Sequence, residues 1–376
     1  MAGIYVHIPF CKSRCVYCGF YSTTRHELRQ RYVDALCKEF RQRENYIELG
    51  KEAERTVYLG GGTPSQLTGE QLSEILECTG GGKEVTIECN PDDLTQDFAD
   101  ILRELPVNRI SMGVQSFNDE TLRLLRRRHN GKQAERAVDL LRNAGFDNIS
   151  IDLMYGLPGQ TLEDWNNDLC RALSLEVEHV SAYSLMFEEG TPLYDKLQKG
   201  ETSEADEELS LKMFSNLTDR LTAHGYEHYE ISNFAAFRDD GTGHKHPMRS
   251  QHNSNYWNQT PYLGLGAAAH SYDGNRRQWN CADIERYIDA IENGRCCHET
   301  EELNDNEKYN ELILTALRTR NGLSMDKLNN EQREYMMKMA RQLIDRDYLA
   351  ISENRLFITR KGIFVSNMIM SELMMV

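Results

Sequence analysis

Short apolar runs alternate with longer amphipathic segments along the first half of the chain. The segments between the runs, such as ELRQRYVDALCKEF and KQAERAVDLLRNAG, place apolar residues at helical spacing. This alternation predicts βαβ units and a parallel sheet. Six units predict an α/β fold with a closed or partial barrel, whose chemistry lies at the carboxyl ends of its strands. The six predicted strands are residues 4–9, 55–60, 84–89, 109–115, 148–156 and 179–186.

The second half of the chain has a different pattern. A seventh strand-like run, residues 226–234, leads into FRDDGTGHKHPMRSQHN, which lacks periodicity and is expected to be a surface loop. After Glu299, three helical segments and the short strand RLFITRKG predict a small helical, winged-helix-like domain. We therefore expect three parts: a barrel (1–235), a connecting segment (236–299) and a C-terminal domain (300–376).

Charge and hydropathy limit the classes of partner. Lys and Arg number 43 against 59 Asp and Glu, a net charge of −16, which would repel a phosphate backbone. Nucleic acid is therefore a poor candidate for the main partner. No segment approaches about 18 uninterrupted apolar residues, and the start MAGIYVHIPF lacks the basic residues of a signal peptide. We expect a soluble, cytoplasmic protein.

Three of the ten cysteines are clustered at ligand spacing. Cys11, Cys15 and Cys18 lie in PFCKSRCVYCGFY, directly after the first predicted strand. The others are scattered and, in a reducing compartment, are expected to be buried or unreactive thiols. They are Cys37, Cys78, Cys89, Cys170, Cys281, Cys296 and Cys297.

Three clustered thiols are compatible with several metal sites. Structural zinc needs four ligands, so the chain would have to add a distant partner such as His7 or His26. A disulfide would leave an odd thiol and is disfavoured in a reducing compartment. Three thiolates on one loop can instead bind three irons of a 4Fe-4S cluster and leave the fourth iron for a reactant.

The motif CKSRCVYC, with an aromatic residue before the third cysteine, resembles that of the radical S-adenosylmethionine (SAM) superfamily. In that family the open iron of a 4Fe-4S cluster binds SAM, and electron transfer cleaves SAM to a 5′-deoxyadenosyl radical. The resemblance implies that Cys11, Cys15 and Cys18 hold the cluster. It also implies a partial (β/α)6 barrel.

Polar residues at the predicted strand ends are candidates for SAM binding. Glycines in GGGTPS (60–65) allow close approach of a ligand to the backbone, and carboxylates in apolar strands are costly unless they face a polar cavity. From the residues alone, the glycines could instead form a tight turn, and the carboxylates could lie at strand ends on the surface. By resemblance, the SAM-binding residues are Tyr5, Tyr17, Gly61, Gly62, Thr63, Glu88, Gln115, Arg127 and Asp152.

Further motifs narrow the resemblance to one branch. SMGVQSF, DLMYGLPGQT, GLGAAAHSY and TRKGIFVSN resemble the branch of oxygen-independent coproporphyrinogen III oxidases and heme chaperones. Phe20 stands where the oxidase motif has a further cysteine, and the chain begins three residues before the first strand, where the oxidase carries an extension. Both features favour the heme chaperones, although Gly19 replaces an acidic residue common in them.

HNSNYW matches the HNxxYW motif of the heme chaperones. The resemblance implies that His252, Tyr256 and Trp257 bind heme, since imidazole ligates heme iron and aromatic rings cover a porphyrin. From the residues alone, His252 reads as a hydrogen-bonded loop histidine. His244 and His246 lie close by in the sequence, as rival ligands or as solvated histidines.

The leading hypothesis is a heme chaperone that carries a 4Fe-4S cluster and SAM, and delivers heme to heme proteins of respiration. The first alternative is an oxygen-independent coproporphyrinogen III oxidase, a radical SAM enzyme of porphyrin biosynthesis. A third hypothesis is a SAM-dependent methyltransferase that opens heme. The resemblance leaves open a peripheral membrane contact and a homodimer.

Overall fold

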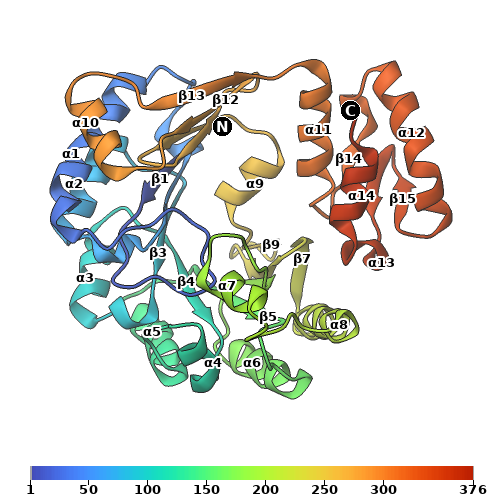
Figure 1. Cartoon of the computed structure of the whole chain (residues 1–376), viewed down its shortest axis with the longest axis horizontal. Helices are drawn as coiled ribbons and strands as arrows, with labels where there is room; N and C mark the ends of the chain where they lie inside the picture. The colour runs from blue at the N-terminus through green and yellow to red at the C-terminus, as the bar shows by residue number, and fades with distance from the viewer. Residues whose placement is uncertain (1, 376) are drawn as a thin grey trace.

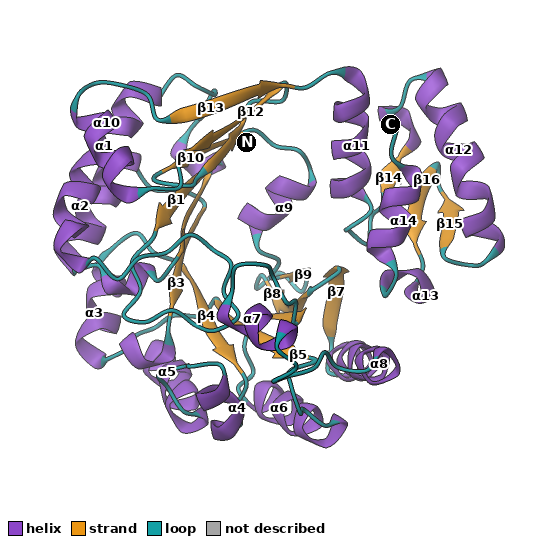
Figure 2. Cartoon of the chain, in the orientation of Figure 1, coloured by secondary structure: helices purple, strands orange, loops and turns teal. Residues whose placement is uncertain are grey.

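The computed structural model describes residues 2–375. Its main sheet contains thirteen strands, and the six predicted βα strands are neighbours in sequence order at its centre. All five pairings among them are parallel, so the predicted partial barrel is confirmed (Figures 1 and 2). The strands are β1 (Gly3–Ile8), β2 (Thr56–Gly61), β3 (Glu84–Cys89), β4 (Arg109–Gln115), β5 (Ile149–Tyr155) and β6 (His179–Ser184).

Helices cover the outer face of the barrel strands (Figure 1). Capping boxes at Thr68, Asn130 and Thr161 fix where three of them begin, because each side chain accepts from a backbone N–H of the first turn. Among residues 2–375, no helix combines the length and apolar character needed to span a bilayer. These helices are α1 (Arg29–Arg43), α2 (Gly69–Thr79), α3 (Gln96–Glu104), α4 (Asp119–Leu124), α5 (Gly131–Asn143), α6 (Leu162–Ser174) and α8 (Glu207–Ala223). Helix α7 (Pro192–Gln198) instead packs on the cysteine loop, where the N–H of Leu193 donates to the carbonyl of Val16.

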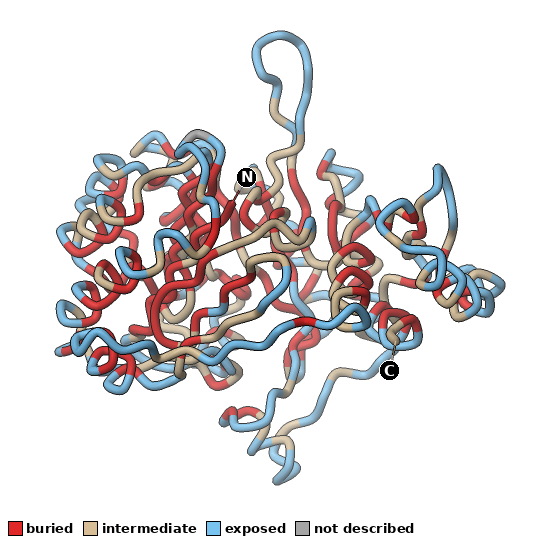
Figure 3. The backbone as a smooth tube through the Cα atoms, turned by 90° about the horizontal axis from the view of Figure 1, so that it is seen from above, coloured by how far each residue is buried: buried red, intermediate tan, exposed pale blue. Residues whose placement is uncertain are grey.

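The main core lies between the sheet and these helices, where Figure 3 shows the buried stretches of chain. In β4, Ile110, Met112 and Val114 are fully buried in this core. Because side chains alternate across a strand, Ser111 and Gly113 of β4 face the inside of the barrel. The interior is therefore lined by the polar half of each alternating strand.

Antiparallel strands extend the sheet at both edges. Beyond β1, the parallel strand β10 (Tyr262–Leu265) is followed by antiparallel β11 (His270–Tyr272), β12 (Arg276–Asn280) and β13 (His298–Glu302). Beyond β6 lie β8 (Asn233–Asp239) and β7 (Tyr226–Glu230). Helix α10 (Ile284–Glu292) packs against α1. The segment expected to connect two domains thus contributes strands to the main sheet.

FRDDGTGHKHPMRSQHN is partly regular, so the expectation of a surface loop was wrong. Strand β9 (Lys245–Pro247) pairs with β8 as a hairpin, and helix α9 (Gln251–Trp257) begins within the same stretch. The hairpin residues from Arg238 to Pro247 are exposed or half-buried. A strand pair that buries neither face has no apolar alternation to detect.

The C-terminal residues form a smaller unit beside the barrel (Figure 2). Its own core includes Ile313, Leu343 and Leu356, and the strand predicted at RLFITRKG is confirmed as β16. Three strands pair in the order β14-β16-β15. The elements are α11 (Asp305–Ala316), β14 (Leu323–Ser324), α12 (Asn330–Asp345), β15 (Leu349–Ser352), β16 (Arg355–Ile358), α13 (Arg360–Ile363) and α14 (Ser366–Leu373).

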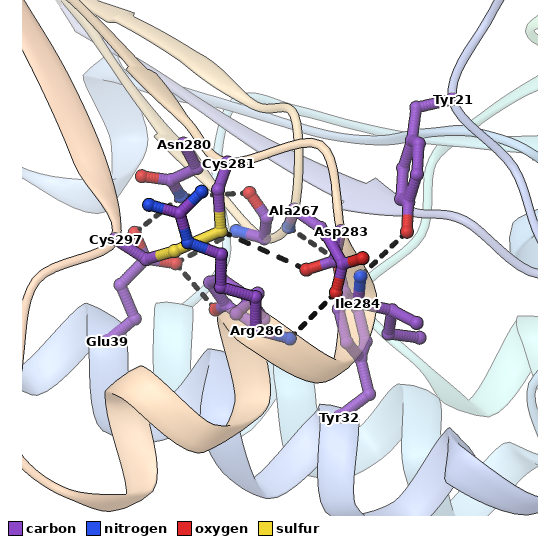
Figure 4. The surroundings of a disulfide bond; sticks show 12 residues. Tyr21, Tyr32, Glu39, Ala267, Asn280, Cys281, Asp283, Ile284, Arg286 and Cys297 are labelled. Atoms are coloured by element: carbon purple, nitrogen blue, oxygen red, sulfur yellow. Dashed lines mark hydrogen bonds between the residues drawn. A yellow bond between two sulfur atoms is a disulfide. The ribbon is translucent and has the colours of Figure 1, made fainter.

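Cys281 and Cys297 form a disulfide, so the expectation of unreactive free thiols was wrong for these two residues (Figure 4). Their Cα atoms lie 5.6 Å apart, because the backbone N–H of Cys281 donates to the carbonyl of Cys297 where β12 and β13 begin to pair. The bond closes the loop that contains α10. Cys170 and Cys296 are free and exposed rather than buried.

Candidate functional site

The three clustered cysteines lie on the loop that leaves the carboxyl end of β1. Cys11, Cys15 and Cys18 are each partly exposed. The Cys11 sulfur lies 3.5 Å from Thr63 Oγ1, and Arg127 Nη1 donates to the Cys15 sulfur at 3.5 Å. The fold therefore places the glycine loop after β2 and the arginine after α4 directly beside the thiols.

The arrangement of the three thiols is compatible with a 4Fe-4S cluster. Among residues 2–375, no three His, Cys, Asp or Glu side chains are grouped so that they could hold one metal ion. A 4Fe-4S cluster does not require such convergence, because each thiolate binds a different iron. Burial raises the pKa of Cys11 and Cys18. The half-buried guanidinium of Arg127 provides a positive charge beside these thiols.

Close packing explains the glycines at the end of β2. Gly61 has φ of 114°, and a Cβ there would lie 2.6 Å from the His7 ring. A Cβ on Gly62 would lie 2.7 Å from the backbone of Pro9, which cannot move aside. The glycines thus let this loop lie against the end of β1, at the base of the cysteine loop.

His7 connects β1 to the cysteine loop. Burial lowers its pKa to about 4, so the ring is neutral at neutral pH. Its Nε2 donates to the carbonyl of Tyr21 at 3.0 Å, and its Nδ1 accepts from the hydroxyl of Tyr5 at 3.2 Å. The His7 ring therefore links Tyr5, inside the barrel, to Tyr21, which follows the cysteines.

Glu88, at the end of β3, is a hydrogen-bonded carboxylate of the interior. It accepts from the Tyr58 hydroxyl at 2.8 Å and from the Gly61 N–H at 3.1 Å. Burial raises the pKa of Glu88 to about 7 and that of Asp152, on β5, to about 6. Glu88 therefore exchanges its proton near neutral pH, while Asp152 is mostly ionised there.

Gln115 and Arg127 complete the set of polar residues at the carboxyl ends of the strands. A bulge between β4 and β5 places Gln115 at φ of 69°. Arg127 donates to the carbonyl of Gly113 and to Asn90 Oδ1 at 2.6 Å. Asn90 in turn donates to Thr63 Oγ1 at 3.2 Å. Sequence reasoning missed Asn90, although it directly follows the strand that carries Glu88.

Tyr5 lies on β1, and Tyr17 lies on the cysteine loop itself. The Tyr5 ring stacks on the Tyr58 ring, with centroids 6.1 Å apart. Tyr17 is half-buried, and burial together with nearby thiols raises its pKa, so it remains a phenol. All nine residues matched to the SAM site therefore belong to the barrel strands or to the loops at their carboxyl ends.

The HNSNYW motif lies at the opposite end of the barrel, on α9. The Glu84 carboxylate, at the start of β3, accepts from the N–H groups of Gln251 and His252 at 2.9 Å each. His252 Nδ1 is hydrogen-bonded to Thr56 Oγ1, at the start of β2, at 2.8 Å. Helix α9 thus closes the amino-terminal end of the barrel, while the cysteines lie at the carboxyl end.

Both ring nitrogens of His252 are hydrogen-bonded in this structure. It is 1% exposed, and its Nε2 is hydrogen-bonded to the Tyr256 hydroxyl at 2.8 Å. Burial and the charge of Arg109 lower its pKa to about 3, so the ring is neutral. Neutral imidazole is the form that ligates iron, but one of the two hydrogen bonds must open before a ring nitrogen can do so.

The other motif residues differ in their surroundings. The indole N–H of Trp257 is buried without a hydrogen-bond partner among the described residues, and Arg318 lies 4.8 Å above the ring. His244 and His246 are exposed on the β8–β9 hairpin. Tyr58 contacts residues at both ends of the barrel. Its ring centroid lies 5.1 Å from that of His252, and its hydroxyl donates a hydrogen bond to Glu88.

Comparison with family models identifies two regions. Residues 5–169 match the model of the radical SAM superfamily, and residues 303–365 match that of the HemN C-terminal domain. The first region contains the cysteine loop and all the residues matched to SAM binding. The second lies within the C-terminal unit.

Curated relatives align with most of the chain. Heme chaperone HemW of Bacillus subtilis is 34% identical, over 98% of this chain and 97% of the relative. Heme chaperone HemW of Escherichia coli is 36% identical, over 71% of this chain and 69% of the relative. Among solved structures, the radical SAM enzyme coproporphyrinogen III oxidase HemN from Escherichia coli superimposes with a TM-score of 0.80 at 23% identity. That match covers 99% of this chain and 89% of HemN, and it shows a common fold.

Proposed function

The chain belongs to the HemW family of the radical SAM superfamily, and on this premise we propose that it is a heme chaperone. It would bind heme and deliver it to heme proteins of respiration. The HNSNYW helix carries the proposal, because it presents a neutral histidine together with a tyrosine and a tryptophan. The relatives named heme chaperone align across this motif and most of the chain.

Cys11, Cys15 and Cys18 would hold a 4Fe-4S cluster, and SAM would lie between this cluster and the barrel strands. When bound, the cluster supplies the electron that cleaves SAM in this superfamily. The chain itself would position SAM through the N–H groups of the glycine loop and the guanidinium of Arg127. The other proposed SAM contacts are Tyr5, Tyr17, Glu88, Gln115 and Asp152.

Heme binding would require a local change at α9. His252 Nε2 is occupied by the Tyr256 hydroxyl, so ligation through this atom needs the tyrosine to turn away. Tyr256 is half-buried and Trp257 is the last residue of the helix, where little regular structure must be broken. We infer that opening of the His252–Tyr256 hydrogen bond admits the heme iron.

Hemin titration tests the proposal. Wild-type protein should develop a Soret band, and His252→Ala should lose most of it. His224→Ala is the matched control, because this histidine is exposed at the end of α8. A double His244→Ala, His246→Ala variant tests the rival ligands. No Soret band in the wild type, or an undiminished band in His252→Ala, would contradict the proposal.

The alternative function is oxygen-independent oxidation of coproporphyrinogen III. The likeness to HemN establishes the fold and does not favour this activity. Phe20, which stands where the oxidase motif has a cysteine, is 69% exposed beside the thiols. Anaerobic incubation of the reduced protein with SAM and coproporphyrinogen should yield no protoporphyrinogen, whereas its accumulation would establish the oxidase.

A further inference from the structure

Arg109 is a buried arginine without a partner inside the barrel. It is the first residue of β4 and is 2% exposed. Its Nε has no hydrogen-bond partner, and none of the ion pairs among residues 2–375 involves it. Buried charges in proteins are normally paired, because removing an ion from water without compensation is costly. Among residues 2–375, no acidic side chain is therefore paired directly with this guanidinium.

The position of Arg109 in its strand directs its side chain into the interior. The next residue, Ile110, belongs to the core beneath the helices, so Arg109 lies on the opposite face with Ser111. Its charge also reaches groups on other elements. It contributes, after burial, to the lowered pKa of His179 on β6 and of His252 on α9. The guanidinium thus lies among elements on several sides of the barrel.

A second polar group beside Arg109 also lacks a partner. Thr86 on β3 is paired with Arg109 in the register of the two strands. It is fully buried, and its hydroxyl makes no hydrogen bond within the described part of the chain. The guanidinium and this hydroxyl are both hydrogen-bond donors on neighbouring strands. A missing acceptor between them would satisfy both.

The neighbouring carboxylates do not supply that acceptor. Glu84 accepts from the first N–H groups of α9. Glu88 accepts from Tyr58 and Gly61, and its pKa of about 7 leaves it partly protonated. The charge of Arg109 lowers the pKa of Asp152 against the effect of burial, but the two side chains form no ion pair among residues 2–375. No acidic side chain of this region is therefore bound directly to the guanidinium.

The interior above Arg109 is open to solvent. Each barrel strand has an accessible residue among buried neighbours, so solvent reaches part of the interior face of every strand. Tyr183 on β6 is 42% exposed. The other five are Tyr5, Tyr58, Glu88, Gly113 and Asp152. A ligand that enters this space meets aromatic rings on its walls and the buried cation at its base.

We propose that Arg109, with Thr86, forms a carboxylate-binding site inside the barrel, and that its ligand is a propionate group of the tetrapyrrole. A guanidinium binds a carboxylate through two parallel hydrogen bonds, which a lysine cannot reproduce. The site lies between α9 and the proposed SAM residues. The identity of the ligand rests on the proposed heme function, but the carboxylate site does not.

Porphyrin binding tests the ligand. Protoporphyrin IX and its dimethyl ester differ only in their carboxylates, and their fluorescence reports binding. Arg109→Gln should weaken protoporphyrin binding at least about tenfold and change ester binding less than about twofold. Arg109→Lys should be intermediate, and Thr86→Val should weaken only the free acid. Equal effects of Arg109→Gln on both porphyrins, or no effect, would overturn the assignment.

A probe without a porphyrin separates this site from the heme proposal. Propionate should raise the thermal midpoint of the wild type relative to equimolar chloride, and it should not raise that of Arg109→Gln. Protection by propionate in a protein that binds no heme would support the site and reject the heme function. Absence of protection in the wild type would overturn the site, whatever the heme result.

Two further measurements exclude other roles of Arg109. A structural arginine would stabilise the ligand-free protein, so the thermal midpoint of Arg109→Gln should equal or exceed that of the wild type. A fall of several degrees would overturn the proposal. SAM affinity should be unchanged in Arg109→Gln, because the arginine proposed to position SAM is Arg127, which lies beside the thiols. Loss of SAM binding would mean that Arg109 binds the carboxylate of SAM, and it would overturn the assignment to a propionate.

Discussion

The Tyr58 hydroxyl donates a hydrogen bond of 2.8 Å to Glu88, at the end of the barrel that carries the cysteines. The same tyrosine ring lies 5.1 Å from His252, at the opposite end. One side chain therefore contacts a residue proposed to bind SAM and the histidine proposed to bind heme. A displacement of Glu88 or of His252 would therefore move a side chain that contacts the other residue.

Tyr58→Phe should shift the pH dependence of SAM binding upward. The Tyr58 hydroxyl stabilises ionised Glu88, so its removal should raise the pKa of Glu88 further above its ordinary value. The midpoint of SAM affinity against pH, measured by calorimetry on the reconstituted protein, should increase. Tyr46→Phe is the control, because the Tyr46 hydroxyl makes no hydrogen bond among the described residues. An unchanged midpoint would show that Glu88 does not govern SAM binding.

Replacement of Cys11, Cys15 or Cys18 by serine should each abolish the brown absorption near ~400 nm of the reconstituted protein. Each thiolate is expected to ligate a different iron, so the loss of one leaves the cluster without a full set of ligands. Iron content and the absorption spectrum after anaerobic reconstitution measure the effect. Cys296→Ser is the matched control, because Cys296 is a free and exposed thiol. Wild-type iron content in any of the three variants would exclude that cysteine as a ligand.

The sequence predicted the strands of the barrel closely but not the arrangement of its interior. The runs at 84–89 and 109–115 coincide with β3 and β4, because apolar and polar residues alternate along both of them. The partner of a polar side chain depends instead on the register between distant strands. For this reason the pairing of Thr86 with Arg109 was not predictable.

The same limitation applies to longer-range features. The HNSNYW motif was recognised, but its place at the amino-terminal end of the barrel depends on contacts with Glu84 and Thr56, far away in sequence. The Cys281–Cys297 bond likewise depends on strand pairing, which the spacing of the two cysteines does not reveal. Local patterns identify elements, whereas these contacts arise only from their assembly.

Glu88→Gln should stabilise the ligand-free protein, increasingly as the pH rises. The folded-state pKa of Glu88 is raised to about 7, above the ordinary glutamate pKa of 4.5, so the folded state binds more protons than the unfolded state between these values. Its contribution to stability is therefore lost as pH rises through that window. The shift corresponds to at most about 3 kcal/mol. Thermal unfolding at pH 5 and pH 8 should show a gain for Glu88→Gln mainly at pH 8.

The control for this pH effect is Glu135→Gln, whose carboxylate is on the surface and pairs with Arg171. It should not show a gain that grows with pH, since surface ion pairs contribute little. If Glu88→Gln is destabilised equally at both pH values, its hydrogen bonds from Tyr58 and Gly61 matter more than its protonation.

Tyr256→Phe should strengthen hemin binding. The Tyr256 hydroxyl occupies His252 Nε2 at 2.8 Å, and an iron ligand at this atom must displace it. A hydrogen bond of this kind contributes about 0.5–1.5 kcal/mol, so its removal should raise affinity about 2- to 10-fold. Soret titration measures the change, and Tyr262→Phe, which removes a neighbouring hydroxyl from a ring packed against Tyr256, is the control. A weaker affinity in Tyr256→Phe would mean that this hydroxyl contacts bound heme, and that iron reaches His252 without displacing it.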